Sequence, residues 1–86
     1  MIQKISAPIS VDLLYDHRKH TVIPRQIFWD GKNLRVDQVG LHHTFRQGRT
    51  LFHIFSVVCQ GLSFRLRLDT ESLFWTLEEL SDGLAN

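Results

Sequence analysis

The fold is decided by the stretch Gln26-Ile27-Phe28-Trp29-Asp30-Gly31-Lys32-Asn33-Leu34-Arg35-Val36, a compact turn between two runs of strand-forming residues. Gly31 supplies the positive φ that a tight turn needs, and β-branched and aromatic residues stand on both sides of it. The stretch therefore predicts a β-hairpin whose turn lies over residues 30–33.

The residues before this hairpin predict one more strand. Apolar and polar residues alternate over 9–15, which is the period of two expected of a half-buried strand. The strand that enters the hairpin begins at about residue 20. Pro24 lies within it and belongs at an edge or a bend, because proline donates no ladder hydrogen bond. Residues 1–8 show no clear period and predict an N-terminal arm.

Two further glycine turns follow the hairpin, at Gln47-Gly48 and Gln60-Gly61. The apolar residues before and after Asp37-Gln38 alternate in opposite phase, and a bulge near this dipeptide would reconcile them. The strands predicted by this pattern cover residues 39–46, 49–59 and 62–69.

The last segment fits two kinds of element. Leu73, Trp75 and Leu77 have strand spacing, whereas the leucines and the nearby Gly83 fit a short capped helix over residues 71–81. The strand is favoured. The predicted fold class is all-β, with about six antiparallel strands in a meander curled into a small barrel or a half-open sheet, and with a short C-terminal helix as the alternative.

The turns also set which residues face one another. If Gln60-Gly61 is a two-residue loop, the large apolar side chains of the flanking strands form one core layer, with the pairs Val57–Phe64, Phe55–Leu66 and His53–Leu68. A four-residue loop over 69–72 adds Trp75 beside Leu66. Across the Gln47-Gly48 turn, Phe55 is placed opposite Gly40. The core layer also takes in Ile27, Trp29, Leu34 and Val36.

The opposite face of this sheet is not simply polar. It carries apolar side chains interspersed with arginines, and the candidate interface or ligand residues are Phe28, Arg35, Leu41, Phe52, Ile54, Arg65, Arg67 and Phe74. A contiguous apolar patch of this kind is uncommon on a monomer. We expect a second copy of the chain to bury it, face to face or at a sheet edge, or the N-terminal arm and the tail to fold over it.

Size and composition predict one small domain over residues 1–86, with 1–8 as an arm and 81–86 as a tail. Ten Lys and Arg against nine Asp and Glu give a net charge of +1, which is too balanced to indicate a nucleic-acid or membrane partner. The single cysteine, Cys59, excludes an intramolecular disulfide. No apolar run approaches the roughly 20 residues of a membrane span. A cytoplasmic location is expected.

The register sets His42 opposite His53, which makes this pair the nearest approach to a metal site. Two ligands are fewer than the three or four of zinc sites, so we expect an ordinary cross-strand pair with no metal and no cofactor. Cys59 lies at a hairpin shoulder, where a small apolar residue is expected. The sequence shows no phosphate-binding glycine loop and no serine elbow, and it does not predict an enzyme.

The chain contains four short motifs, Phe28-x-x-Gly31-x-x-Leu34-x-Val36, Phe52-x-Ile54, Phe64-x-Leu66 and Trp75-x-Leu77. In these motifs, over about residues 24 to 80, the chain resembles a group of small bacterial all-β proteins of unknown function. Those proteins carry an aromatic-Trp-x-Gly hairpin and a closing Trp-x-Leu strand. They often have a tryptophan where this chain has His42-His43-Thr44-Phe45. The resemblance implies a bacterial β domain and assigns no functional residue.

The sequence favours a non-catalytic interaction or self-association module that uses the apolar and arginine face, as a homodimer or with another protein. The alternative is single-stranded nucleic-acid binding, in which bases stack on the aromatic rings and arginines follow the phosphates. The register places Arg67 across from Phe74 and Arg65 diagonal to Glu78. Both arginines then have partners within the sheet, which favours the first function.

Overall fold

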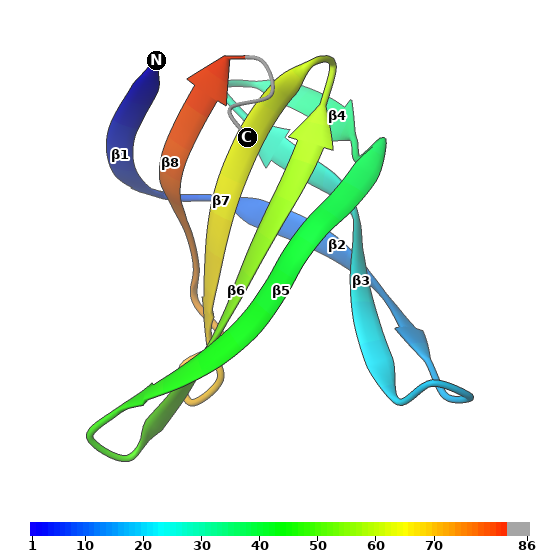
Figure 1. The fold of residues 1–86 in the computed structure, drawn as a ribbon, viewed down its shortest axis with the longest axis vertical. Helices are drawn as coiled ribbons and strands as arrows, with labels where there is room; N and C mark the ends of the chain where they lie inside the picture. The colour runs from blue at the N-terminus through cyan, green and yellow to red at the C-terminus, as the bar shows by residue number, and fades with distance from the viewer. Residues whose placement is uncertain (83–86) are drawn as a thin grey trace.

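The computed structural model describes residues 1–82, in which eight antiparallel strands form two sheets (Figure 1). The larger sheet has the order β1-β8-β7-β6-β5 and the smaller one the order β2-β3-β4. The strands are β1 (Ile2–Pro8), β2 (Ser10–Asp16), β3 (Thr21–Trp29), β4 (Lys32–Arg35), β5 (Gln38–Gln47), β6 (Thr50–Cys59), β7 (Leu62–Asp69) and β8 (Trp75–Asp82).

The all-β antiparallel class is therefore confirmed, whereas the single six-stranded meander and the closed barrel are wrong. Both sheets keep open edges, and no helix occurs in residues 1–82. The last segment is strand β8, as favoured, and not the alternative helix. Residues 83–86 of the predicted tail lie outside the described part, while Ser81 and Asp82 belong to β8.

The chain passes from the small sheet to the large one at Val36 and Asp37. The Val36 N–H donates to the carbonyl of Arg25 in β3 at 2.9 Å, whereas the Asp37 N–H donates to the carbonyl of Val58 in β6 at 2.8 Å. Neighbouring residues thus bond to different sheets. This crossing replaces the bulge predicted near Asp37-Gln38 and causes the change of phase in the apolar pattern.

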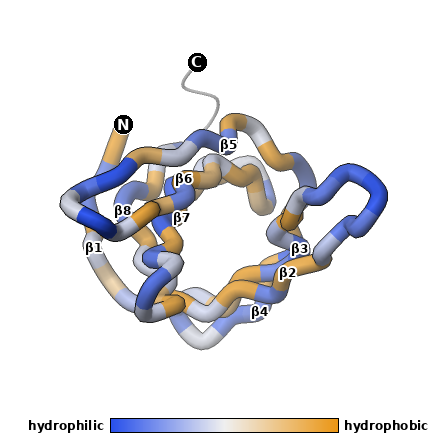
Figure 2. Tube along the Cα trace, turned by 90° about the horizontal axis from the view of Figure 1, so that it is seen from below, coloured by the Kyte–Doolittle hydropathy of each residue, from blue (hydrophilic) through white to orange (hydrophobic). Residues whose placement is uncertain are grey.

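The core lies between the two sheets, which face each other in Figure 2. Both contribute large apolar side chains with almost no exposed area. The buried cluster consists of Ile9, Ile27, Leu34, Phe55, Val57, Cys59, Phe64, Leu66 and Leu77. Trp29 and Val36 are partly buried and pack against it. Most of the core layer predicted from alternation is confirmed, although two sheets rather than one supply it. The predicted pair His53 and Leu68 is only partly buried and lies outside the cluster.

The hairpin turns obey the predicted chemistry. Gln60 and Gly61 have φ of 53° and 77°, so the loop has two residues and the pairs predicted between β6 and β7 are all present. The β5–β6 loop consists of Gly48 and Arg49, one residue later than predicted, because Gln47 pairs with Thr50. That one-residue difference moves the β6 partners of residues 42–47 by two positions, and those of Gln38 and Val39, beyond the bulge, by one.

The shifted ladder corrects one predicted contact. Phe55 pairs with His42 and not with Gly40. Gly40 lies instead in a bulge of β5, where a Cβ atom would stand 3.4 Å from the Ser56 carbonyl oxygen. The absent side chain thus allows two backbones to approach each other closely.

The β7–β8 connection is also longer than predicted. Asp69 organises it, because its carboxylate accepts the N–H groups of Glu71 and Ser72 at 2.9 and 3.1 Å and its carbonyl accepts that of Leu73 at 2.7 Å. Leu66 therefore faces Leu77 and not Trp75. The shift is two residues, an even number, so Trp75 and Leu77 stay on the core face. Beyond them the register shifts between Arg65 and Leu66, which reverses the alternation in β8, so Leu80 lies opposite Phe64 and packs against the core.

The N-terminal segment is a strand and not a loose arm. Residues 2–8 form β1, which pairs with β8 at the edge of the large sheet, with an irregularity between Lys4 and Ala7. Pro24 meets its prediction. It lies where the register of β2 and β3 shifts, and β4 ends its pairing with β3 at Gln26.

Candidate functional site

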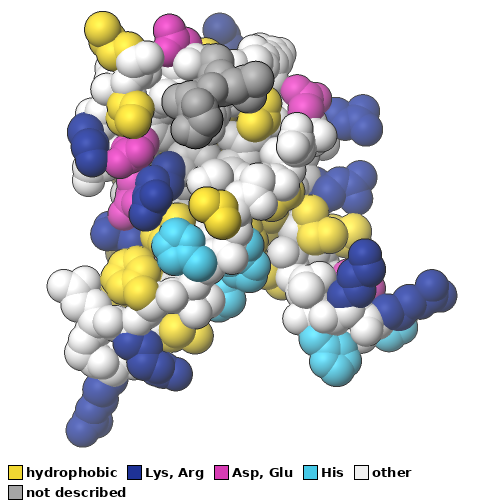
Figure 3. All heavy atoms as spheres, viewed as in Figure 1, with side chains coloured by type: hydrophobic (Ala, Val, Ile, Leu, Met, Phe, Trp, Pro, Cys, Tyr) yellow, Lys and Arg dark blue, Asp and Glu magenta, His cyan; other side chains and the backbone are white. Residues whose placement is uncertain are grey.

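The large sheet has an outer face, which points away from the small sheet and toward the viewer in Figure 3. Hydrophobic, basic and acidic side chains gather over β5 to β8 on this face. Strand alternation brings them there, because residues next to core positions point outward. We call the residues Phe45, Phe52, Ile54, Arg65, Arg67 and Glu78 the outer-face cluster.

The cluster has an aromatic part on β5 and β6. Phe45 and Phe52 are directly opposite, and their rings stack with centroids 5.1 Å apart and an interplanar angle of 16°. On the other side, the Arg67 guanidinium lies 5.4 Å from the centroid of the Phe52 ring. Phe52 is thus flanked by a ring and by a cation, which is a favourable arrangement for an aromatic side chain.

Ile54 is the buried centre of the cluster. Its side chain is only 1% exposed although it points outward. The neighbouring strands place His43 and Arg67 across from it, and Phe52 and Ser56 flank it along β6. These neighbours shield it from water, so Ile54 supports the outer face but is not itself free to contact a partner.

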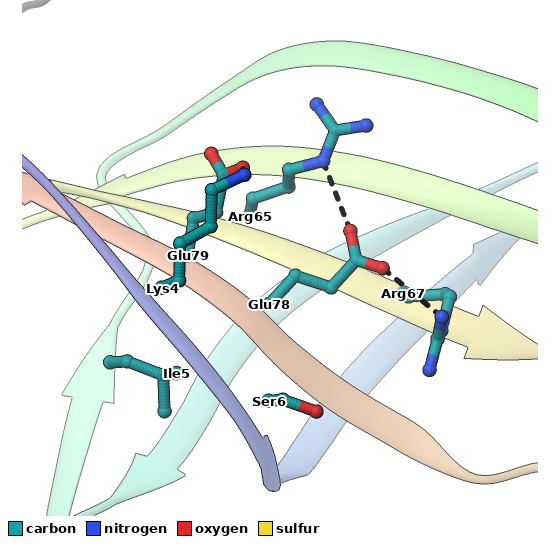
Figure 4. A pocket seen from close by; sticks show the side chains of 7 residues that line it. All are labelled: Lys4, Ile5, Ser6, Arg65, Arg67, Glu78 and Glu79. Atoms are coloured by element: carbon teal, nitrogen blue, oxygen red, sulfur yellow. Dashed lines mark hydrogen bonds and ion pairs between the residues drawn. The ribbon is translucent and has the colours of Figure 1, made fainter.

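The cluster has a charged part on β7 and β8. The two carboxylate oxygens of Glu78 bind Arg65 Nε at 3.0 Å and Arg67 Nη1 at 3.2 Å (Figure 4). The register shift in β8 causes this arrangement, because Arg65 pairs with Glu79 and Leu66 with Leu77, which leaves Glu78 as the extra residue. All three side chains are partly exposed, so each pair adds little stability.

A hollow of about 450 Å³ lies beside this charged part, between β1 and β7. Lys4 Nζ binds Glu79 at 2.8 Å across it, and this hydrogen bond lowers the pKa of the Glu79 carboxyl. Each of the charged side chains that line the hollow therefore has an opposite charge beside it (Figure 4). Glu78 occupies one nitrogen of each arginine, so a phosphate or a carboxylate would meet two guanidinium groups whose charge is already partly neutralised.

The structure brings together four of the predicted candidates, namely Phe52, Ile54, Arg65 and Arg67. Phe74 lies in the loop before β8 and is 73% exposed, and Leu41 lies on β5 and is 65% exposed. Phe28 and Arg35 lie on the small sheet, outside the outer-face cluster. The eight candidates therefore do not form one surface.

Phe45 is not among the sequence candidates. A β5–β6 loop at Gln47-Gly48 would set Phe45 opposite Thr50, a partner that gives no indication of an aromatic pair. The observed loop sets it opposite Phe52. Cross-strand aromatic pairs are favourable, so testing both loop positions for such pairs could have identified Phe45.

His42 and His53 do meet, but diagonally. His42 pairs with Phe55, and its Nε2 lies 2.8 Å from Nδ1 of His53. The His42 ring also stacks on Phe55 at 4.2 Å. Burial lowers the pKa of His42, and the charges of His53 and His43 lower it further. Within residues 1–82, no three His, Cys, Asp or Glu side chains are grouped to hold a metal ion.

Cys59 lies in the core, fully buried. Burial raises the pKa of its thiol to about 11, and the negative charge of Asp37 contributes. Because the thiolate is the reactive form of cysteine, this thiol is a poor nucleophile near neutral pH. The small apolar role predicted for Cys59 fits its position in the buried cluster.

We expect the protein to lose stability between about pH 9 and pH 11. The Cys59 thiol ionises near 9.0 when exposed by unfolding and near 11 in the folded chain, so its contribution is complete below 9 and is lost as the pH rises through 11. The free energy of unfolding measured with urea should be lower at pH 11 than at pH 8, and ionisation of Cys59 should account for on the order of 2 kcal/mol of the difference. The Cys59→Ala variant should lack this part of the pH dependence. An equal loss of stability with pH in the variant and in the wild type would contradict the prediction.

Residues 1–82 contain no helix that could cross a membrane.

The resemblance to small bacterial β proteins, drawn from the Phe28–Val36 hairpin and the closing Trp75-x-Leu77, stays a prediction. Comparison of the chain with family models, with curated proteins and with solved structures finds no match.

Proposed function

We propose that this protein is a non-catalytic self-association module. In this proposal a second copy covers the aromatic part of the outer-face cluster where it reaches the edge of the sheet at β5. The observation that carries the proposal is the stacked pair of Phe45 and Phe52, which stands beside that edge with Phe45 39% exposed. Leu41, on the same strand, is 65% exposed.

The chemistry of the cluster supports a protein partner. Aromatic and arginine side chains are enriched at the energetic centres of protein interfaces, where they are held rigidly before binding. Phe52 is held in this way between Phe45 and Arg67. A partner that covers these rings meets an apolar surface whose nearby charges are already paired with one another.

The same pairing argues against single-stranded nucleic acid as the ligand. Phosphates bind arginines that are free to exchange counterions, and Glu78 already binds both Arg65 and Arg67. Arg35, the third arginine of that hypothesis, lies on the small sheet. The three arginines therefore do not follow one track along an aromatic surface.

Phe45→Ala is expected to dissociate the assembly while leaving the fold intact. Truncating a central aromatic side chain of an interface costs about 2 kcal/mol, or roughly a thirtyfold increase in Kd. Sedimentation equilibrium over a range of protein concentrations measures this change. Phe28→Ala is the matched control, because Phe28 is also an exposed phenylalanine, 52% exposed on the small sheet.

Two results would contradict the proposal. One is a wild-type protein that stays monomeric at high micromolar concentration. The other is an equal loss of association in Phe45→Ala and Phe28→Ala, which would show that the outer face of the large sheet is not the contact surface.

A further inference from the structure

We propose that the second copy adds to strand β5, edge to edge and antiparallel, about a two-fold axis through His43. This inference rests on the proposed self-association and specifies how the two copies meet. It follows from three features of β5: its unprotected edge, the direction of its outward backbone groups, and the spacing of its exposed apolar side chains.

The two open sheets have four edge strands, and three of them carry features that block strand addition. β1 is irregular between Lys4 and Ala7 and ends at Pro8. The register of β2 shifts between Asp12 and Leu13, and β4 has only four residues. These features make each of the three edges a poor template for another strand.

β5 differs from the other three edges. It is ten residues long, and its irregularity is confined to the part between Val39 and His42. From His42 to Gln47 it pairs with β6 without interruption and contains neither proline nor lysine. On its other side, no strand within residues 1–82 pairs with it. A regular edge of this kind is a template for strand addition.

The β5–β6 turn fixes which backbone groups of β5 point outward. Because its loop has two residues, the closing pair of Gln47 and Thr50 is hydrogen bonded. Alternation along the strand then directs the groups of Phe45 and His43 toward β6. The N–H and C=O groups of His42, Thr44 and Arg46 point to the open edge, where a second strand can bind them.

The exposed side chains select one register. A two-fold axis perpendicular to the sheet keeps the outer faces of both copies on one side, and Leu41 and Phe45 stand two residues before and after His43. An axis through His43 therefore sets Leu41 of each copy opposite Phe45 of the other. These are the two exposed apolar side chains of β5.

Neighbouring registers are poorer. An axis through Thr44 sets Arg46 opposite His42 and leaves Leu41 against Gln47. An axis through Phe45 joins two rings but sets Leu41 against Arg49. With the axis at His43, Arg46 lies opposite Gly40, which has no side chain, and the two five-stranded sheets join into one of ten strands.

Thr44→Pro tests the edge. The substitution removes an N–H that points outward, so the ladder with β6 keeps its hydrogen bonds while the added strand loses one in each copy. We expect at least about a hundredfold increase in Kd by sedimentation, with the circular dichroism spectrum of the wild type. Thr44→Val, which keeps the N–H and the strand preference, should associate as the wild type does.

Cysteine crosslinking tests the register and does not depend on how well the proline variant folds. In the His43→Cys variant the two new cysteines face each other across the axis. Their Cα atoms would be about 4.5 Å apart, which is within the range for a disulfide. Arg46→Cys is the control, because its two copies would be six residues apart along the strands, about 20 Å. Mild oxidation should crosslink the first variant into a dimer and not the second, while buried Cys59 stays unmodified.

The outcomes separate the two proposals. A wild-type dimer that persists in a folded Thr44→Pro variant, or that gives no crosslink in His43→Cys, overturns edge pairing and leaves self-association standing. Equal crosslinking of His43→Cys and Arg46→Cys overturns the register. A monomeric wild type overturns the proposed function itself. Loss of the dimer in Thr44→Pro, together with a crosslink confined to His43→Cys, supports the inference.

Discussion

Phe55→Ala is expected to lower the free energy of unfolding by about 3–5 kcal/mol, the range for truncating a buried phenylalanine. The Phe55 side chain is 1% exposed. Its ring stacks on His42 at 4.2 Å and lies 5.7 Å from the ring of Trp75. These partners belong to β5 and β8, so the ring joins strands on both sides of β6. Alanine would leave a cavity that none of the surrounding strands can close alone.

Urea unfolding followed by tryptophan fluorescence measures this loss. Phe74→Ala is the matched control, because Phe74 is 73% exposed and its truncation should change stability by no more than about 0.5 kcal/mol. Phe55→Leu keeps much of the buried volume and serves if the alanine variant does not fold. Equal losses in Phe55→Ala and Phe74→Ala would contradict the assignment of the two residues to different environments.

The core position of Phe55 could be predicted from the sequence because its pairing with Leu66 across the β6–β7 turn is local. Gln60-Gly61 fixes a two-residue loop, and everything between β6 and β7 follows by counting from it. Alternation then assigns each side chain to a face. The turn between β3 and β4 was predicted in the same way over residues 30–33, but it consists of Asp30 and Gly31 alone, with φ of 54° and 72°, because Trp29 pairs with Lys32. Hairpins can be predicted in this way because the turn and both strands lie within a few residues of one another.

Features that depend on distant parts of the chain could not be predicted. The crossing between the two sheets at Val36 and Asp37 changes the phase of the apolar pattern. A bulge within one sheet would change the phase in the same way, so the pattern alone does not distinguish a crossing from a bulge. β1 pairs with β8, whose paired residues are 68 to 79 positions away along the chain, and its own residues show no period. The loop of Gly48 and Arg49 is ambiguous by one residue, and that ambiguity hid the pairing of Phe45 with Phe52.

The candidate site shows the same division. The sequence predicted which side chains of β6 and β7 leave the core, and Phe52, Arg65 and Arg67 do so. It also predicted that the arginines have partners within the sheet. Glu78 binds Arg65 as expected, but Phe52 rather than Phe74 lies under Arg67. The difference arises from the loop before β8, whose length is set by Asp69.

Ile54→Ala is expected to cost about 2–4 kcal/mol, although Ile54 points away from the core. Its side chain is as well buried as that of Phe55, at 1% exposed. The cover comes from Phe52 along β6 and from His43 and Arg67 on the neighbouring strands. The carbon stem of an arginine can shield apolar surface while its charge stays in water. Removing three carbons beneath this cover leaves a cavity that long side chains only partly fill.

The measurement also separates the stability of one copy from association. If the neighbours within one chain bury Ile54, the loss caused by Ile54→Ala is the same at every protein concentration. If a second copy supplied the cover, the loss would grow with concentration, because binding adds stability only when the partner is present.

Leu41→Ala is the control, since Leu41 is 65% exposed and lies at the proposed contact. In dilute protein it should change stability by less than about 0.5 kcal/mol, while at high concentration it should weaken the dimer. An Ile54→Ala variant as stable as the wild type in dilute protein would show that the outer face is not packed within one chain.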